Sequence, residues 1–153
     1  MDALEILKQD HQRVKQLFEE ATHASDPNKR KDLFDKIDTE LEIHAHIEET
    51  VFYPALEQHE ELQDMVAEAL EEHLEVKTLL KEIEELGSEN HDFGGKLQEL
   101  MESVEHHVAE EEGEMFPKVR EVFDERELDE LARQLNSAKG VQNREAVKVK
   151  ATQ

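Results

Sequence analysis

Residues 44–54 read HAHIEETVFYP and residues 107–117 read HVAEEEGEMFP, and this repeated pattern decides the fold. In each copy, two glutamates follow the histidine at the fourth and fifth positions, and a proline follows it at the tenth. A histidine and a glutamate four residues apart share one face of an α-helix, about 6 Å apart along its axis. Each copy therefore predicts a helix with two potential metal ligands on one face. The pairs are His44 with Glu48 and His107 with Glu111.

A second repeat lies upstream of these two segments. Residues 11–17 read HQRVKQL and residues 73–79 read HLEVKTL, which agree at the histidine and at the valine, lysine and leucine after it. From this histidine to the histidine of the next HxxxE pair there are 33 residues in one copy and 34 in the other. The chain therefore reads as two copies of one helical hairpin, which would pack around a pseudo-twofold axis.

Apolar residues recur at alternating steps of three and four in four segments, which predicts four amphipathic helices. We expect them before the turn at residues 25–27, from about residue 28 to a kink at Pro54, from about residue 60 to Gly87, and after a turn at Gly94 and Gly95. The prediction is an all-α fold, an antiparallel four-helix up-and-down bundle with a short C-terminal helix and tail. We assign residues 1–123 to the bundle, and residues 124–153 to a short helix around residues 125–135 and a flexible tail.

Composition limits the classes of function. The 153 residues carry a formal net charge of −22, which disfavours nucleic acids and anionic membranes as partners. The absence of cysteine excludes disulfides, thiolate metal sites and thiol nucleophiles. The sequence contains no apolar run near the length of a signal peptide or a membrane span, so we expect a soluble cytoplasmic protein.

The predicted bundle brings four imidazoles and two carboxylates together in an apolar seam. No lysine or arginine lies on these stripes at that level, so metal cations are the simplest way to compensate buried Glu48 and Glu111. Six ligands exceed one tetrahedral zinc site but suit two metals, each with two imidazoles and a share of two bridging carboxylates. The predicted ligands are His11, His44, Glu48, His73, His107 and Glu111.

Mixed nitrogen and oxygen ligands suit iron, manganese, cobalt or zinc rather than calcium or magnesium. We expect two iron ions in a di-iron centre, with manganese or zinc as weaker candidates. Coordination positions left open would let dioxygen, peroxide or nitric oxide reach the metals.

The pattern H, HxxxE, H, HxxxE resembles the hemerythrin family, and more closely its bacterial HHE cation-binding members, over roughly residues 1–120. The resemblance implies a four-helix bundle around a non-haem di-iron centre and assigns the ligand role to the same six residues. Two departures from oxygen-carrying hemerythrins argue against oxygen storage. Lys77 stands where they have a second histidine, and the fourth helix has HxxxE in place of HxxxxD.

Other polar residues near the predicted ligands receive separate predictions. His46 points to solvent, and His106 with Glu110 forms a competing HxxxE pair about 100° around the helix from the seam. Glu49 and Glu112 either orient neighbouring groups or stay solvated, and a share in the metal shell is a lesser alternative. Tyr53 is predicted to pack at the end of the bundle with its hydroxyl in water. Phe52 and Met115 are predicted to surround the metal site with apolar surface.

Two functional hypotheses remain open. In the first, the chain is a di-iron protein that binds dioxygen, peroxide or nitric oxide in oxidative or nitrosative stress, as catalyst or sensor. The alternative is a non-catalytic module that binds, stores or senses a divalent metal such as iron. A purely structural bundle would bind no metal. The sequence contains no recognisable output domain, so a sensor would signal through a separate protein partner, which the sequence does not identify.

Overall fold

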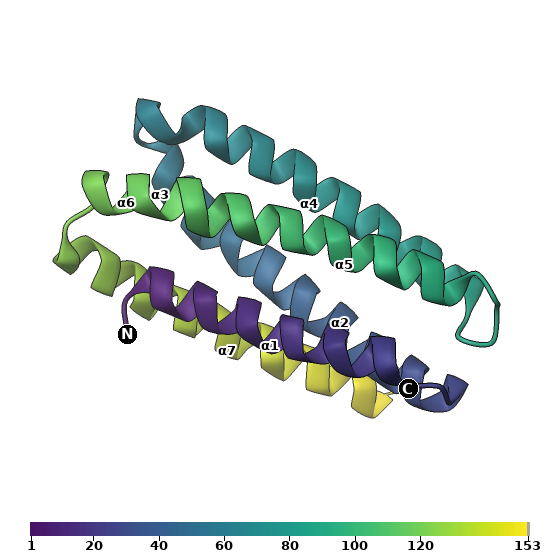
Figure 1. Ribbon diagram of the computed structural model, residues 1–153. Helices are drawn as coiled ribbons and strands as arrows, with labels where there is room; N and C mark the ends of the chain where they lie inside the picture. The colour runs from purple at the N-terminus through teal and green to yellow at the C-terminus, as the bar shows by residue number, and fades with distance from the viewer. Residues whose placement is uncertain (153) are drawn as a thin grey trace.

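The chain folds as an all-α bundle, as predicted. The computed structural model describes residues 1–152, with side chains through residue 143. Two antiparallel hairpins form the bundle (Figure 1). The first hairpin pairs α1 (Ala3–His23) with α2 (Pro27–Ile47), and the second pairs α4 (Glu60–Leu86) with α5 (Phe93–Glu110).

The ends of the helices follow local chemistry. Asp2 accepts a hydrogen bond from the backbone N–H of Glu5 at the start of α1, at 3.0 Å. Asp26 does the same for Asn28 at the start of α2, where Pro27 occupies the first turn. Gly87 ends α4 with a φ of 81°, a conformation that glycine adopts without strain.

The fourth bundle helix starts earlier than predicted. It begins at Phe93, so Gly94 and Gly95 lie in its first turn rather than in a preceding turn. The side chain of Phe93 is 1% exposed and packs in the core. Burial of one phenylalanine stabilises the structure by about 1.5–3 kcal/mol, which offsets the helix propensity lost at two glycines, about 1 kcal/mol each.

Both helices that carry an HxxxE pair widen into a π-helical turn before their proline. α2 continues into η1 (Glu48–Phe52) and α3 (Tyr53–Glu57), and α5 continues into η2 (Glu111–Met115) and α6 (Phe116–Val122). Because a proline ring clashes with the carbonyl four residues earlier, the preceding turn opens to bonds five residues apart. The backbone N–H of Tyr53 accordingly donates to the carbonyl of Glu48, and that of Phe116 to the carbonyl of Glu111.

The C-terminal helix is longer than expected. α7 (Glu125–Thr152) continues past residue 135, through the segment predicted as a tail, and lies along α1 and α2 (Figure 1). A glycine inside a helix costs only about 1 kcal/mol, so Gly140 does not interrupt it. Leu128, Leu131 and Leu135 are buried and anchor α7 in the core. The division of the chain at residue 123 stays a prediction.

A polar layer divides the core into two apolar clusters. One cluster contains Leu7, Phe52, Phe116 and the leucines of α7. The other contains Val14, Phe18, Ile37, Leu80 and Val104. The six predicted ligands lie between the two clusters, so the polar layer is enclosed by apolar side chains on both sides.

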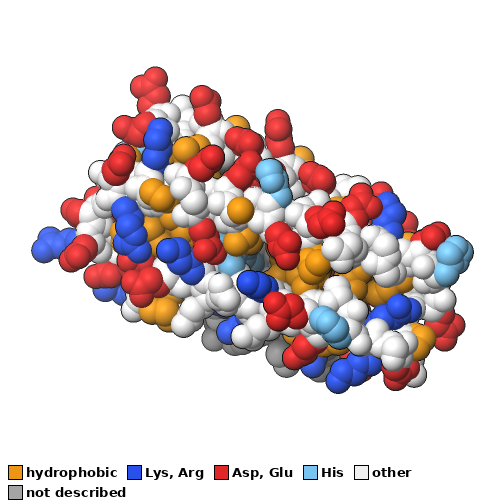
Figure 2. Space-filling view, viewed as in Figure 1, with side chains coloured by type: hydrophobic (Ala, Val, Ile, Leu, Met, Phe, Trp, Pro, Cys, Tyr) orange, Lys and Arg blue, Asp and Glu red, His pale blue; other side chains and the backbone are white. Residues whose placement is uncertain are grey.

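The surface is strongly acidic. Figure 2 shows Asp and Glu side chains spread over the whole visible face, with Lys and Arg between them. No helix in the described part of the chain has an apolar stretch long enough to cross a bilayer.

One surface carboxylate makes stability depend on pH. Burial and the nearby carboxylates of Glu42 and Glu84 raise the pKa of Asp38 to about 7. Between about pH 4 and pH 7 the folded chain keeps a proton that the unfolded chain has lost, so this group lowers stability as pH rises. Asp38→Asn should therefore stabilise the protein more at pH 8 than at pH 5.

The expected gain at pH 8 is about 1 kcal/mol, after allowance for solvent screening of a half-buried group. Urea unfolding at both pH values measures it. Asp32→Asn, an exposed position on the same helix, controls for the loss of one charge. Equal effects of Asp38→Asn at the two pH values would contradict the pKa of about 7.

Candidate metal centre

Four histidines from four helices meet in the polar layer as two pairs. The ring centroids of His11 (α1) and His44 (α2) are 4.9 Å apart, and those of His73 (α4) and His107 (α5) are also 4.9 Å apart. Each hairpin therefore supplies one pair.

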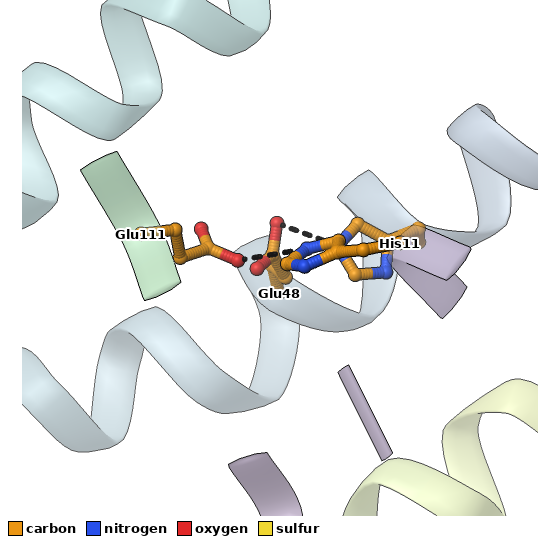
Figure 3. A group of neighbouring side chains, drawn as sticks. His11, Glu48 and Glu111 are labelled. Carbon is orange, nitrogen blue, oxygen red and sulfur yellow. Dashed lines mark ion pairs between the residues drawn. The ribbon is translucent and has the colours of Figure 1, made fainter. Parts of the chain in front are cut away.

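Two buried carboxylates connect the pairs. Oε1 of Glu111 lies 3.3 Å from Nε2 of His11, and its Oε2 lies 3.1 Å from Nε2 of His107. Oε1 of Glu48 lies 3.3 Å from Nε2 of His44 and 3.1 Å from Nε2 of His73. Figure 3 shows the carboxylate of Glu111 directed toward the imidazole of His11, with the carboxylate of Glu48 beside it. Each carboxylate thus faces both histidine pairs, the arrangement that bridging of two cations requires.

Five of the inner atoms of this cluster lack hydrogen bonds. Among the described residues, six buried side-chain atoms have no hydrogen-bond partner, and five of them lie here. These five are Nε2 of His11, His44 and His107, Oε2 of Glu48 and Oε1 of Glu111. Unpaired buried polar atoms cost free energy unless something binds them. Nitrogen and carboxylate oxygen atoms that converge in this way fit two cations, one beside each histidine pair.

In each of the four clustered histidines, the outer ring nitrogen, Nδ1, forms a hydrogen bond with a carboxylate. The Nδ1 atoms of His11, His44, His73 and His107 lie 2.6, 2.9, 2.7 and 2.7 Å from Glu112, Asp10, Glu49 and Glu72, respectively. A carboxylate that accepts the Nδ1–H of a ligating histidine fixes the ring orientation and raises the basicity of Nε2. All four imidazoles are therefore preset to present Nε2 to the centre.

These carboxylates follow a rule of position. The acid directly before the first histidine of each hairpin, Asp10 or Glu72, holds the second histidine of the same hairpin. The acid directly after the buried glutamate, Glu49 or Glu112, holds the first histidine of the other hairpin. The prediction that Glu49 and Glu112 orient neighbouring groups agrees with this geometry, whereas Asp10 and Glu72 were missed.

Protonation compensates the buried carboxylates when metal is absent. Burial alone would lower the pKa of His44, but the charge of Glu48 and the hydrogen bond to Asp10 raise it well above its ordinary value. Burial likewise opposes ionisation of Glu48, but His44 and His73 hold its pKa well below the ordinary value. Cations bound here would replace these protons, so any metal affinity should fall as pH decreases.

The prediction for Tyr53 was wrong. Its side chain is 1% exposed, and its hydroxyl lies in the polar layer rather than in water. The hydroxyl is 2.7 Å from Oε2 of Glu111, 3.2 Å from Oε1 of Glu48 and 3.2 Å from Nε2 of His73. The widened turn places position 53 beside position 48, which an ideal helical periodicity does not predict. Phe116, at the matching position of the other hairpin, stacks on His11 with centroids 6.2 Å apart.

The neighbouring polar residues lie outside the ligand cluster. His46 is exposed, as predicted. The side chain of His106 is 67% exposed and lies 3.0 Å from Glu110 and 3.5 Å from Glu72. Lys77 donates hydrogen bonds of 3.0 Å to both oxygens of Glu49, so it acts on His73 only through that carboxylate.

α7 also reaches the surroundings of the centre. Asp10 is 2% exposed, and it pairs with Lys139 of α7 as well as with His44. This contact connects a helix outside the repeated hairpins to one histidine of the cluster.

Comparisons with known proteins agree on the family. The sequence model described as Hemerythrin HHE cation binding domain matches residues 2–119. The crystal structure of a hemerythrin HHE cation binding domain-containing protein from Mycobacterium kansasii superposes with a TM-score of 0.85 at 28% identity. The match covers 97% of this chain and 91% of that protein.

Two curated relatives are longer than this chain. A DNA nickase of Nostoc sp. is 29% identical over 139 residues, which cover 91% of this chain and 39% of that protein. An uncharacterized hemerythrin-like protein of Schizosaccharomyces pombe is 29% identical over 125 residues, 80% of this chain and 62% of that protein. The chain thus spans less than two thirds of either relative.

The carboxylates on the outer nitrogens predict a measurable effect. Asp10→Asn should weaken metal binding by about 10- to 100-fold, because an amide no longer holds the Nδ1–H of His44 with a negative charge. Titration against a chelator of known affinity measures the change. Asp64→Asn replaces an exposed carboxylate and should leave the affinity unchanged. Equal affinities for the two variants would contradict the positioning role of Asp10.

Proposed function

The chain belongs to the hemerythrin HHE cation-binding domain family, and we propose that it is a di-iron protein that binds dioxygen, peroxide or nitric oxide. We propose further that it acts in oxidative or nitrosative stress. The observation that supports two metal ions is the position of the two buried carboxylates, Glu48 and Glu111. Each of them lies beside one histidine of the first hairpin and one histidine of the second. A cytoplasmic location remains a prediction.

The ligand set divides naturally between two ions. His11 and His44 would hold one ion, His73 and His107 the other, and the two glutamates would bridge them. Two imidazoles and shared carboxylates suit iron, with manganese and zinc as weaker candidates. When bound, a pair of ferrous ions would supply two electrons and open coordination positions, which binding and reduction of peroxide require.

The chain itself contributes orientation, exclusion of water and a hydrogen-bond donor. The apolar clusters on both sides of the layer keep bulk water from the carboxylates. Burial and the charges of Glu48 and Glu111 raise the pKa of Tyr53, so its hydroxyl keeps its proton at neutral pH. Tyr53 therefore presents a hydrogen-bond donor beside both carboxylates, on one side of the pseudo-symmetric centre only.

The alternative is a non-catalytic module that stores or senses iron. The same ligands support metal uptake in both cases, and only reaction with a small oxidant separates them. The DNA nickase name belongs to a relative of which this chain covers 39%. We do not extend nicking to this chain, because a net charge of −22 repels a polyanion.

Metal content and reactivity test the proposal. Protein purified from iron-supplemented cells should contain about two irons per chain, as six shared ligands imply. Its absorption spectrum should change on addition of hydrogen peroxide. His44→Ala and Glu111→Ala should each lose most of the iron, because each removes a ligand and leaves buried polar groups unpaired.

Matched controls use neighbouring residues of the same type. His46→Ala and Glu114→Ala replace exposed side chains next to the ligands and should keep the full iron content. One metal per chain, or metal that survives His44→Ala and Glu111→Ala, would refute the dinuclear site. Two irons that do not respond to peroxide, dioxygen or nitric oxide would favour the storage module.

A further inference from the structure

The two sides of the polar layer are packed differently. On the side of the carboxylates, Phe52, Tyr53 and Phe116 fill the core with large rings, each at most 2% exposed. On the side of the histidines, a cavity of about 340 Å³ opens between the helices. All four histidines line it, whereas Glu48 and Glu111 do not.

The residue types at the wall explain why this cavity stays open. Beyond the histidines, the walls are formed mainly by short branched side chains, and three of them stand three residues from a histidine of the centre. These are Val14 after His11, Val76 after His73 and Val104 before His107. Leu41, Ala45, Leu80 and Val108 complete the apolar wall. A valine does not reach as far across a bundle as leucine or phenylalanine does, so this layer stays open.

The cavity is much larger than a diatomic ligand or hydrogen peroxide requires. A water molecule occupies about 30 Å³ in the liquid, and an apolar cavity of about 150 Å³ accommodates benzene. A volume of about 340 Å³ lies in the range of pockets that hold small organic molecules. Its apolar walls favour an apolar body, because such surface gains free energy when it is removed from water.

The charges around the centre favour a neutral ligand. Two bridging carboxylates and the four on the outer nitrogens bring six negative charges. Two divalent cations, Lys77 on Glu49 and Lys139 on Asp10 would balance them. No positive charge is then left to hold an anion, and the exposed rim adds the carboxylate of Glu42.

We propose that this cavity binds an organic hydroperoxide, R–O–O–H, with an apolar body of about ten heavy atoms against the valines and its peroxide end at the histidines. This assignment rests on the proposed di-iron function and names its substrate class. Reduction of the ligand breaks the O–O bond, consumes two electrons and two protons, and yields R–OH and water. Two ferrous ions held by the histidines and glutamates would supply the two electrons, one each, and an external one-electron donor such as ascorbate would restore them between turnovers.

Binding is tested without turnover. The probe is 2-phenyl-2-propanol, the unreactive alcohol that corresponds to cumene hydroperoxide, titrated into the protein as purified and followed by NMR. A Kd on the order of 1 mM is expected for a ligand of this size. Val76→Phe/Val104→Phe should weaken binding at least tenfold by filling the cavity. Leu74→Phe, at a side chain 63% exposed on the same helix as Val76, is the matched control and should bind as the wild type does.

Two single variants guard against misfolding of the double variant. Val76→Leu and Val104→Leu each add one methylene group to the wall, and each should weaken binding of the alcohol in proportion to the space that it fills. Unchanged binding in all cavity variants, or no binding to the wild type, would overturn the proposal.

Turnover separates this proposal from the function on which it rests. With ascorbate as electron donor, the iron-loaded protein should consume cumene hydroperoxide with a lower KM than hydrogen peroxide. The cavity variants should lose at least tenfold more in kcat/KM for cumene hydroperoxide than for hydrogen peroxide, whereas Leu74→Phe should keep the kcat/KM of the wild type for both. Consumption of hydrogen peroxide alone would overturn the organic substrate and leave the di-iron function intact. Binding of the alcohol without consumption of either peroxide would overturn the hydroperoxide substrate and leave only binding of dioxygen or nitric oxide for the di-iron function.

Discussion

Two carboxylates in the centre of an apolar bundle impose the constraint on which the rest of the structure depends. Glu48 and Glu111 are 0% and 1% exposed, and buried ionised carboxylates are costly unless positive charge lies beside them. Four imidazoles surround them, and protonation or metal binding at these rings supplies that charge. The same carboxylates start the two π-helical turns, so the local backbone irregularity and the chemical requirement occur at the same residues.

The sequence repeat explains how a short chain places a carboxylate on the Nδ1 atom of all four histidines. Each hairpin carries an acid before its first histidine, and each ligand-bearing helix carries a second glutamate after the buried one. Asp10 and Glu72 each hydrogen-bond a histidine on the other helix of the same hairpin. Glu49 and Glu112 each hydrogen-bond a histidine of the other hairpin. The hydrogen bonds therefore fix both the pairing of helices within each hairpin and the packing of one hairpin on the other.

Apolar periodicity and the repeated HxxxE pairs were sufficient to predict the bundle and the six residues that meet at its centre. Periodicity failed where a turn departs from 3.6 residues, and for this reason Tyr53 was placed in water although its hydroxyl contacts Glu111. Asp10 and Glu72 were missed although a signal exists, since both repeats place an acid directly before the first histidine. The length of α7 was missed because the helix was predicted to end near residue 135, although Gly140 costs only about 1 kcal/mol inside a helix and does not end it.

The six predicted ligands occupy matching positions in the two hairpins, but the residues around them differ between the hairpins. Tyr53 donates a hydrogen bond on one side, whereas Phe116, its counterpart, only stacks on His11. Asp10 forms an ion pair with Lys139 of α7, which packs along the first hairpin. Among the described helices, none packs in the same way along the second hairpin. Two ions held here would therefore experience different hydrogen bonding and different charge. Because such inequality separates the redox and ligand-binding properties of two otherwise similar metals, an exogenous ligand need not bind both ions equally.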